Sequence, residues 1–344
     1  MSKASTKRSQ SRLRSGSDPA AIREAEQVLS RGGLVGLPTE TVYGLAADAR
    51  NPRAVAAIFK AKGRPDHNPL ICHVSGRDMA TTLAEANDAA EALMGAFWPG
   101  PLTLVLPHRA DSGLAPAVTA GLPTVAVRQP GHDVAAALIS TFGGPLAAPS
   151  ANPSGRLSPT RAADVLDGLG NKVDLVLDGG PCTGGIESTI VGVDHDRLVL
   201  LRPGLVTSGE LAAVGHLPVV SRDGDTITAP GQAASHYAPH APVVLDRESA
   251  SPPDVLIGFD DVPGLPEGLT LSPTGNLEEA AHSLFATLRQ ADGLIGEGGR
   301  IHVAPIPASG IGLAIRDRLI RAAAPRPTEE TDRIGDAGKA GENP

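Results

Sequence analysis

The chain has 344 residues, of which 41% are hydrophobic and 20% charged, but only 2% are aromatic. Its formal net charge of -8 argues against a protein that is dedicated as a whole to nucleic-acid binding. Its two cysteines, Cys72 and Cys182, are too few for a disulfide framework or a four-ligand zinc site, so a reducing cytoplasm is the expected location.

The first 17 residues are basic and rich in serine, and no apolar segment follows them. They predict a disordered tail rather than a signal peptide. No apolar run is long enough to span a bilayer. Asp18 is then the expected N-cap of a helix that starts at Pro19 and ends at the glycine pair 32–33. A short buried strand is expected over 33–37.

A second helix is expected from Pro52, with Asn51 as its N-cap and Gly63 at its end. Lys62 and Arg64 lie at its C-terminus, where the helix dipole favours cations. The same pair of cations could instead clamp a polyphosphate. The pattern leaves both interpretations open.

Apolar runs then alternate with helical stretches, which favours an α/β fold with a mixed sheet, because some strand-like runs are adjacent in the chain. The expected strands are 69–74, 102–107, 124–128, 173–180, 188–193 and 197–204, and the expected helices between them are 133–143 and 160–170.

Strand alternation places His73 on the same face as Ile71, where a satisfied buried histidine and a substrate contact are both possible. In the strand 124–128, Thr124 and Arg128 share a face and are about 13 Å apart. That spacing suits the two ends of an extended ligand, with Arg128 binding a carboxylate, although a surface salt bridge is the simpler alternative.

Two loops rich in small polar residues follow strands, at 147–155 and 178–191. Each is an ordinary turn or a site where hydroxyls and backbone N–H groups bind phosphate oxygens. From about Ser221 the composition changes to glycine, proline, alanine and serine, which is typical of a linker. His236 and His240 are separated by Pro239, so they are not expected to share a metal ion.

A compact unit of alternating strands and helices follows the linker, with helices expected over 276–292 and 312–324. The predicted organisation is a basic tail (1–17), a catalytic domain (18–215), an interdomain linker or lid (216–241), a smaller Rossmann-like α/β domain (242–325) and a second disordered tail (326–344).

Taken together, the motifs resemble the threonylcarbamoyl-AMP synthase family, whose catalytic unit is the YrdC-like domain. The motifs that carry the resemblance are "PTETVYGL", "AKGRP", "NPLICHV", "FWPGPLTLVL", "TVAVRQP", "APSANPSG", "GIESTIV" and "LLRPG", continued by "APGQAASHYAPHAP" and "GIGLAIRDRLIRAA". The resemblance implies a twisted mixed sheet with a concave active-site surface and the family's long, two-domain form.

The resemblance also implies a reaction in which L-threonine, bicarbonate and ATP give threonylcarbamoyl-AMP and pyrophosphate. Mg²⁺ is expected with the ATP phosphates. A separate transferase complex is the expected downstream partner, with at most a weak contact to tRNA and none to a membrane.

Matching the family's motifs residue by residue implies three sets of site residues. The catalytic set is Lys62, Arg64, Ser150 and Asn152; the L-threonine set is Thr41, His73, Arg128, Ala148 and Ser188; the ATP set is Arg64, Asn68, Thr124, Ser150, Ser158, Arg202 and Tyr237.

One departure from the family pattern lies in the linker, where a more basic stretch is usual and this chain has residues 232–235, Gln-Ala-Ala-Ser. Two other functions compete with the synthase. One is an RNA-binding protein with the same concave domain, against which the net charge counts. The other is a carbamoyl-transfer enzyme, whose cysteine-rich zinc modules this chain lacks.

Overall fold

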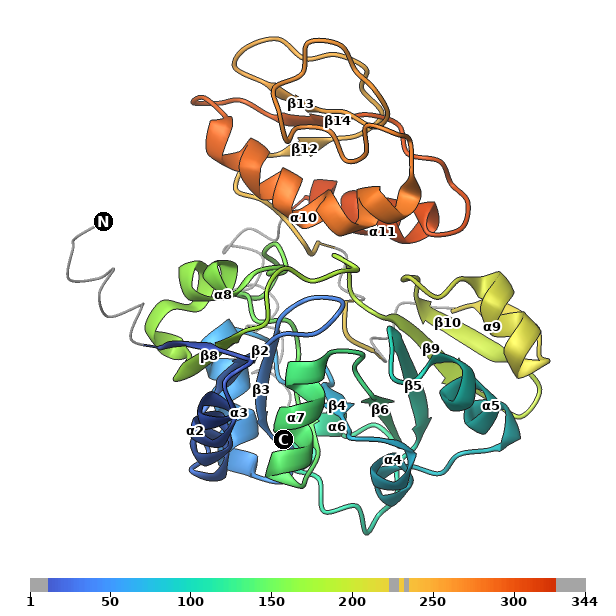
Figure 1. The fold of residues 1–344 in the computed structure, drawn as a ribbon. Helices are drawn as coiled ribbons and strands as arrows, with labels where there is room; N and C mark the ends of the chain where they lie inside the picture. The colour runs from blue at the N-terminus through green and yellow to red at the C-terminus, as the bar shows by residue number, and fades with distance from the viewer. Residues whose placement is uncertain (1–11, 223–228, 232–234, 326–344) are drawn as a thin grey trace, which may run out of the picture.

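The computed structural model describes residues 12–222, 229–231 and 235–325. It contains an 11-stranded sheet in the order β1-β8-β2-β3-β7-β4-β6-β5-β9-β10-β11 and a separate 3-stranded sheet in the order β12-β14-β13. The larger sheet has both parallel and antiparallel pairs, such as β4 with β6 and β5 with β6. The predicted mixed α/β fold is therefore confirmed, and Figure 1 shows its two parts.

The catalytic part holds most of the elements. Its strands are β1 (Leu13–Ser15), β2 (Val35–Leu37), β3 (Gly44–Asp48), β4 (Ile71–His73), β5 (Leu102–Pro107), β6 (Thr124–Arg128), β7 (Leu146–Ala147), β8 (Leu175–Asp178), β9 (Thr189–Val193), β10 (Leu198–Arg202) and β11 (Val219–Ser221). Its helices are α2 (Pro19–Ser30), α3 (Pro52–Lys62), α4 (Arg77–Leu83), α5 (Asp88–Phe97), α6 (Pro116–Thr119), α7 (Asp133–Phe142), α8 (Ala162–Leu169) and α9 (Ser208–Gly215), with a 3₁₀ turn at Gly170–Lys172.

The predicted caps decide where α3 begins and ends. The Asn51 side chain accepts hydrogen bonds from the backbone N–H groups of Arg53 and Ala54. Gly63 ends the helix in a left-handed conformation with φ of 60°, which glycine adopts without strain. This turn separates Lys62, whose ammonium donates to backbone oxygens of the loop at 150–152, from Arg64, which donates to Pro69 O.

The prediction of a disordered tail over 1–17 is wrong at its end. Leu13–Ser15 forms β1, which pairs in parallel with β8, and Arg14 makes an ion pair with Glu24 of α2 at 2.7 Å. The pattern missed this strand because it is short and flanked by polar residues. Its pairing is supplied entirely by β8, a segment far along the chain. The rest of the predicted tail, residues 1–11, lies outside the described residues.

The predicted start of the linker at residue 216 is also wrong, because Val219–Ser221 forms β11 and pairs in parallel with β10. The large sheet therefore continues into the segment assigned to the linker. The departure from the family pattern at Gln232, Ala233 and Ala234, and the predicted C-terminal tail at 326–344, lie outside the described residues.

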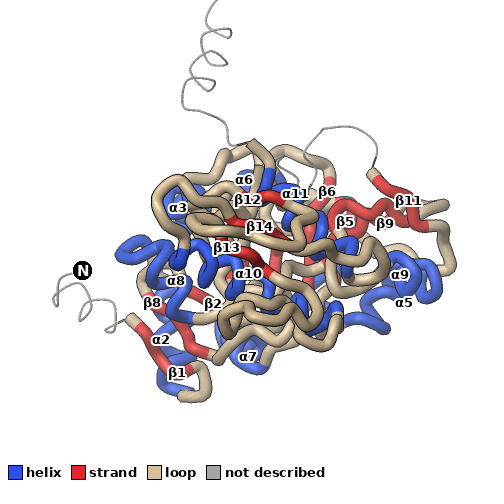
Figure 2. The backbone as a smooth tube through the Cα atoms, turned by 90° about the horizontal axis from the view of Figure 1, so that it is seen from above, coloured by secondary structure: helices blue, strands red, loops and turns tan. Residues whose placement is uncertain are grey.

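The C-terminal part consists of β12 (Val243–Val244), β13 (Val255–Ile257), α10 (Leu277–Leu294), β14 (Ile301–Val303) and α11 (Gly312–Ala323). Its strands are all parallel, as expected for a small Rossmann-like unit. Helices α10 and α11 lie between its sheet and the catalytic part (Figure 1), and Figure 2 shows the small sheet from above. No described helix is both long and apolar enough to cross a membrane.

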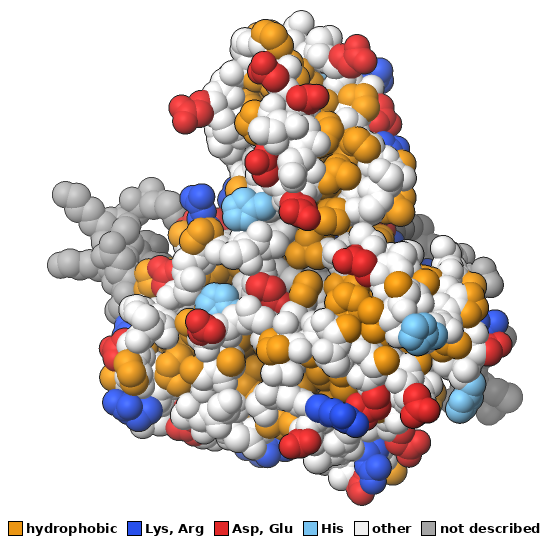
Figure 3. Space-filling view, turned by 45° about the vertical axis from the view of Figure 1, so that its right-hand side comes forward, with side chains coloured by type: hydrophobic (Ala, Val, Ile, Leu, Met, Phe, Trp, Pro, Cys, Tyr) orange, Lys and Arg blue, Asp and Glu red, His pale blue; other side chains and the backbone are white. Residues whose placement is uncertain are grey.

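A shared hydrophobic cluster joins the two parts. Val42, Leu157 and Ile186 of the catalytic part pack in one cluster with Leu284 and Phe285 of α10. The C-terminal domain thus forms one packed interface with the loops that surround the concave side of the large sheet. Figure 3 shows the smaller lobe seated on the larger one.

Candidate active site

A pocket opens where the large sheet, two loops and the linker meet. Its walls come from segments that are distant in the sequence but adjacent in the fold. The lining residues are Thr39, Thr41, Val42, Gly44, Arg64, Ile71, His73, Arg128, Ala148, Pro149, Ser150, Glu187, Ser188, Arg202, Pro230, Gly231, His236 and Tyr237.

Strand alternation explains how the sheet presents polar side chains to this pocket. Cys72, Val125 and Val127 point into the main core, as the sequence predicts. His73 and Arg128, which are register partners on β4 and β6, lie on the opposite face and line the pocket. The sheet therefore places a histidine and an arginine side by side on its concave surface.

Lys62 and Arg64 are held by backbone carbonyls rather than by carboxylates. The Lys62 ammonium donates to the backbone oxygens of Ser150 and Asn152, the latter at 2.6 Å. The Arg64 guanidinium donates to Pro69 O at 3.0 Å. Burial holds the pKa of Lys62 well below its ordinary value and lowers the pKa of Arg64 to about 10. The carbonyl partners carry no formal charge, so an anionic ligand would stabilise the charged form of each group against the effect of burial.

The other end of the pocket is polar and largely neutral. The hydroxyls of Thr39 and Thr41 are 2.9 Å apart, and the Thr39 hydroxyl also donates to Val42 O. Burial, followed by the nearby Arg128, lowers the pKa of His73 to about 3, so its imidazole is neutral at physiological pH. Its Nδ1 atom has no hydrogen-bond partner and can accept one from a ligand.

Arg128 is positioned by a carboxylate outside the pocket. Its Nη2 lies 2.7 Å from Oε1 of Glu40, and its Nε donates to Gly100 O at 3.1 Å. Arg128 holds the pKa of Glu40 below its ordinary value, against the effect of burial. Glu40 lines two neighbouring surface hollows but not the pocket itself. It therefore holds the guanidinium from behind while Arg128 faces the pocket.

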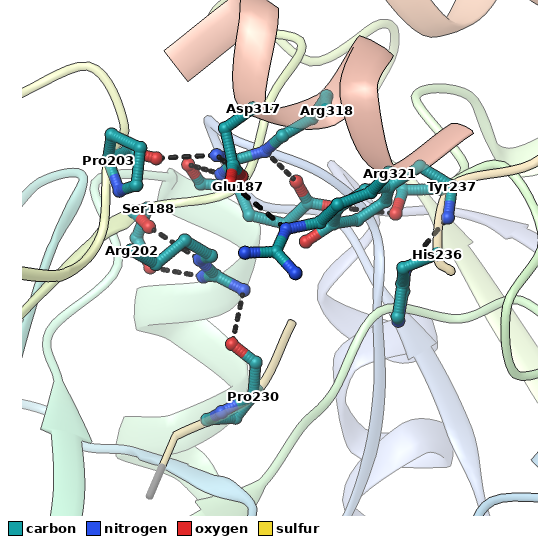
Figure 4. A network of polar contacts seen from close by, with 11 residues as sticks. Glu187, Ser188, Arg202, Pro203, Pro230, His236, Tyr237, Asp317, Arg318 and Arg321 are labelled. Atoms are coloured by element: carbon teal, nitrogen blue, oxygen red, sulfur yellow. Dashed lines mark hydrogen bonds and ion pairs between the residues drawn. The ribbon is translucent and has the colours of Figure 1, made fainter. Parts of the chain in front are cut away.

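A second carboxylate, Glu187, lies in the pocket wall beside Ser188. Its side chain accepts a hydrogen bond from the Ser158 hydroxyl and lies 3.1 Å from Nε of Arg318 on α11. Arg202 donates to the backbone oxygen of Ser188 at 3.1 Å and to its hydroxyl at 3.2 Å. Figure 4 shows Glu187, Ser188 and Arg202 of the catalytic part beside Arg318 of the C-terminal part.

The linker covers the pocket and is tied to both domains. The backbone N–H of His236 donates to Arg321 O of α11, and that of Ala238 donates to Gly155 O. Tyr237 has a buried ring that packs against Phe285 of α10, with the ring centroids 5.6 Å apart.

The structure brings most of the predicted site residues to this pocket. All five predicted L-threonine residues line it, and so do four residues of the ATP set, Arg64, Ser150, Arg202 and Tyr237. Lys62 and Asn152 lie directly behind its wall, joined through the Lys62 ammonium. Ser158 is one contact removed, through Glu187.

Two further predicted residues, Asn68 and Thr124, also do not line the pocket. Asn68 is buried, and its backbone oxygen accepts a hydrogen bond from Arg64 at 3.4 Å. Thr124 lies half-buried at the far end of β6, opposite Pro107 in register. Thr124 would meet a ligand only if that ligand extends beyond the pocket along the strand.

The sequence does not predict four polar contributors: Thr39, Glu40, Glu187 and His236. Both glutamates stand inside the motifs "PTETVYGL" and "GIESTIV", next to residues that were singled out. Each is a carboxylate in a short, mostly uncharged segment, and this pattern could have indicated a role in the site. Carboxylates in such segments are buried only when they have a charged or hydrogen-bonding partner. The tyrosine of the first motif, Tyr43, does not line the pocket. Its hydroxyl donates to Gly180 O at 2.7 Å and fixes the neighbouring glycine loop.

The fold and the site together define a two-domain α/β enzyme with a pocket on its large sheet that is lined by the arginines Arg64, Arg128 and Arg202. A family model described as "Telomere recombination" matches residues 27–204, and one described as "Threonylcarbamoyl-AMP synthase, C-terminal domain" matches residues 206–324. The chain belongs to the threonylcarbamoyl-AMP synthase family.

Similar proteins cover nearly the whole chain. The threonylcarbamoyl-AMP synthase of Bacillus subtilis (strain 168) is 40% identical over 331 residues, which cover 89% of this chain and 93% of that protein. The Pyrococcus abyssi protein of the same name is 39% identical, covering 88% and 93%. A crystal structure of P. abyssi Sua5 complexed with L-threonine aligns with a TM-score of 0.77 at 37% identity, covering 88% of this chain and 94% of that one.

Proposed function

We propose that this chain converts L-threonine, bicarbonate and ATP into threonylcarbamoyl-AMP and pyrophosphate, for the threonylcarbamoyladenosine modification of tRNA. One observation carries the proposal: Thr41, His73, Arg128, Ala148 and Ser188, which the family motifs match to L-threonine, come together in one pocket with Arg64 and Arg202. The P. abyssi relative, which is crystallised with L-threonine, supports the same substrate.

The charge balance of the site suits these substrates. Lys62, Arg64, Arg128 and Arg202 are all buried around one pocket. Two carboxylates, Glu40 and Glu187, lie at this site, and each makes an ion pair with an arginine. Because a buried cation needs an anionic partner, the excess of cations favours a ligand that carries several negative charges, as ATP does.

We propose the following roles at the L-threonine end. Arg128 binds the carboxylate, held in place from behind by Glu40. The hydroxyls of Thr41 and Ser188 and the backbone of Ala148 orient the side chain and the amine. The neutral His73 accepts a hydrogen bond at Nδ1, which favours the amine over a second anion.

In the proposed reaction, the threonine nitrogen first forms a bond to the carbon of bicarbonate, with loss of water, to give a carbamate. A carbamate oxygen then attacks the α-phosphorus of ATP, and the bond to the pyrophosphate oxygen breaks. Arg64, Arg202 and the Ser150–Asn152 loop, which Lys62 fixes, hold the phosphates in line. The contribution of this chain is positioning and charge neutralisation, without a covalent enzyme intermediate.

We propose Mg²⁺ only as the ion that ATP itself carries, where it would neutralise phosphate charge. Within the described residues no group of three His, Cys, Asp or Glu side chains could hold a metal ion. Glu187, the carboxylate in the pocket wall, is already engaged by Arg318 and Ser158. We derive no step through a protein-bound metal.

The product would pass to a separate threonylcarbamoyl-transferase complex, with at most a weak direct contact to tRNA. A cytoplasmic setting is consistent with Cys72 and Cys182, which are buried free thiols. An RNA-binding protein without synthase activity is the competing function. The net charge of -8 counts against it. On the face shown in Figure 3, basic side chains are scattered rather than gathered into a patch.

Pyrophosphate release from ATP by the purified chain tests the proposal, with L-threonine and bicarbonate omitted one at a time. We expect release only when both are present. Pyrophosphate release that continues when either substrate is omitted would refute the synthase.

In the same assay, Arg128→Ala is expected to raise the KM for L-threonine far more than the KM for ATP, because the guanidinium is assigned to the amino-acid carboxylate. Equal losses would move Arg128 out of the L-threonine site.

A further inference from the structure

Arg318 of α11 reaches from the C-terminal domain into the wall of the active site. Its side chain has 0% exposure and is the largest fully buried side chain among the described residues. Its Nε lies 3.1 Å from Oε2 of Glu187, and its Nη1 donates to Pro203 O at 2.6 Å and to Asp317 at 3.1 Å. Nη2 donates to the backbone oxygen of Glu187 at 3.3 Å.

The Arg318 guanidinium therefore donates hydrogen bonds to both the side chain and the backbone of Glu187. The other carboxylate oxygen of Glu187 accepts from the Ser158 hydroxyl. The Arg318 guanidinium also lies 5.5 Å from the ring centroid of Tyr237, which lines the pocket. One residue of the second domain therefore contacts both the pocket wall and the linker (Figure 4).

Glu187 is an unusual group to find in a pocket for an anionic ligand. Its charge acts on Lys62 and Arg202, and it raises the pKa of each while burial lowers it. Arg202 donates to Ser188, the residue next to Glu187, and lines the same pocket. If the carboxylate were free to turn, Arg202 could form an ion pair with it. Arg202 would then be unavailable to a phosphate, and the negative charge would repel the ligand.

We propose that Arg318 is a positioning residue of the active site: it holds Glu187 against the C-terminal domain and so keeps Arg202 available for the phosphates of ATP. The inference rests on the proposed function. It assigns the second domain a part in nucleotide binding, because the site is complete only when α11 is docked.

Arg318→Met tests the proposal, since it keeps the volume of the side chain but removes its charge and donors. We expect ATP binding, measured by calorimetry without L-threonine, to weaken by at least about tenfold, because a nearby unpaired carboxylate repels the phosphates. L-threonine is a zwitterion with no net charge, so its affinity is expected to change by less than about threefold. Arg316→Met is the matched control on the same helix, because Arg316 contacts Asp246 and Ile306 within the C-terminal domain.

Rescue separates positioning from a merely structural role. Glu187→Gln removes the charge that Arg318 restrains, so the double variant Arg318→Met/Glu187→Gln is expected to recover most of the ATP affinity. A structural role would disturb the backbone of Glu187 and Ser188, and would weaken L-threonine at least as much as ATP. Equal losses of the two ligands, or no rescue, would overturn the proposal.

A second substitution and an activity measurement complete the experiment. If Arg318→Met does not fold, Arg318→Lys replaces it, because lysine keeps the charge but makes fewer contacts. The loss of ATP affinity in Arg318→Lys must again exceed the loss of L-threonine affinity. Adding Glu187→Gln must again restore ATP affinity. Pyrophosphate release by the unaltered chain, dependent on L-threonine and bicarbonate, is measured alongside. Absence of pyrophosphate release by the unaltered chain would refute the proposed function. Normal release by that chain, together with variants that do not lose ATP affinity as expected, would refute the role of Arg318.

Discussion

At the scale of single residues, this site contains buried charged side chains, and the partners of each side chain determine where it points. Arg128 and Arg318 each face a glutamate, whereas Lys62 and Arg64 contact backbone carbonyls. An arginine fork can bind a carboxylate and still present donors elsewhere, so a paired arginine keeps its geometry when a ligand arrives. The buried neutral His73 belongs to the same arrangement and makes a testable contribution to stability.

His73 is expected to make the protein less stable as the pH falls. Its folded pKa is about 3, below the ordinary value of 6.5. Between these values the unfolded chain takes up a proton that the folded chain does not, so stability is lost as pH falls through this window, with a slope that approaches about 1.4 kcal/mol per pH unit.

Urea unfolding of the wild type and of His73→Asn at pH 7.5, 6 and 5 measures this contribution. The free energy of unfolding should fall less steeply in the variant. The pKa of His236 is also lowered by burial, but its contribution is present in both proteins and cancels. Parallel curves for the two proteins would contradict the assignment.

At the scale of elements, caps and alternation act locally and place the site residues. Asn51 and Gly63 set the ends of α3 and therefore the positions of Lys62 and Arg64. Alternation along β4 and β6 decides that His73 and Arg128 face the pocket. In contrast, β1 has no local signal of its own. It exists because β8 offers it an edge to pair with.

Two truncated chains test the contribution of β1. A chain that starts at residue 18 is expected to be less stable than one that starts at residue 12, by about 2 kcal/mol, because backbone hydrogen bonds of roughly 1 kcal/mol each are lost and β8 becomes an edge. Denaturant unfolding measures the difference. The longer chain is the control, since both lack residues 1–11, and equal stabilities would show that β1 contributes nothing.

At the scale of the whole molecule, the two domains share one interface beside the active site. The loop that contains Gly184 and Gly185 joins them: the N–H of Gly184 donates to Glu40 O at 2.7 Å, and His282 of α10 contacts Thr183 O at 3.0 Å. A Cβ atom at Gly185 would lie 2.4 Å from the backbone oxygens of Ala281 and His282. The close approach of α10 thus depends on a missing side chain.

Gly185→Ala is therefore expected to destabilise the protein well beyond the strain of a positive φ. Gly113→Ala is the matched control, because Gly113 has φ of +70° against +74° for Gly185, but its Cβ would meet no atom within 4 Å. Both variants carry a strain of about 1 kcal/mol, and only Gly185→Ala adds the clash with α10. The free energy of unfolding of each variant measures the difference. Similar losses of stability in the two variants would indicate that the interface accommodates the added methyl group without a loss of stability.

The sequence by itself determined the mixed α/β class, the helix ends, the faces of the strands and, through its motifs, a set of site residues that the pocket largely gathers. These features depend on neighbours in the chain, so periodicity, caps and motif order are enough to predict them. The elements β3, α4, α5 and α9 were not predicted from the sequence. The strands β1 and β11 were not predicted either, because a three-residue strand depends on pairing with the strand beside it.

Only the tertiary structure decided which charges meet. Glu187 and Arg318 are 131 residues apart, and nothing in the spacing of either motif predicts their contact. Burial removes water as the alternative partner, so each buried charge must find a complement supplied by the packing of whole elements. For that reason the motifs predict many of the residues that line this pocket, while the docking of the second domain determines how Glu187 is held.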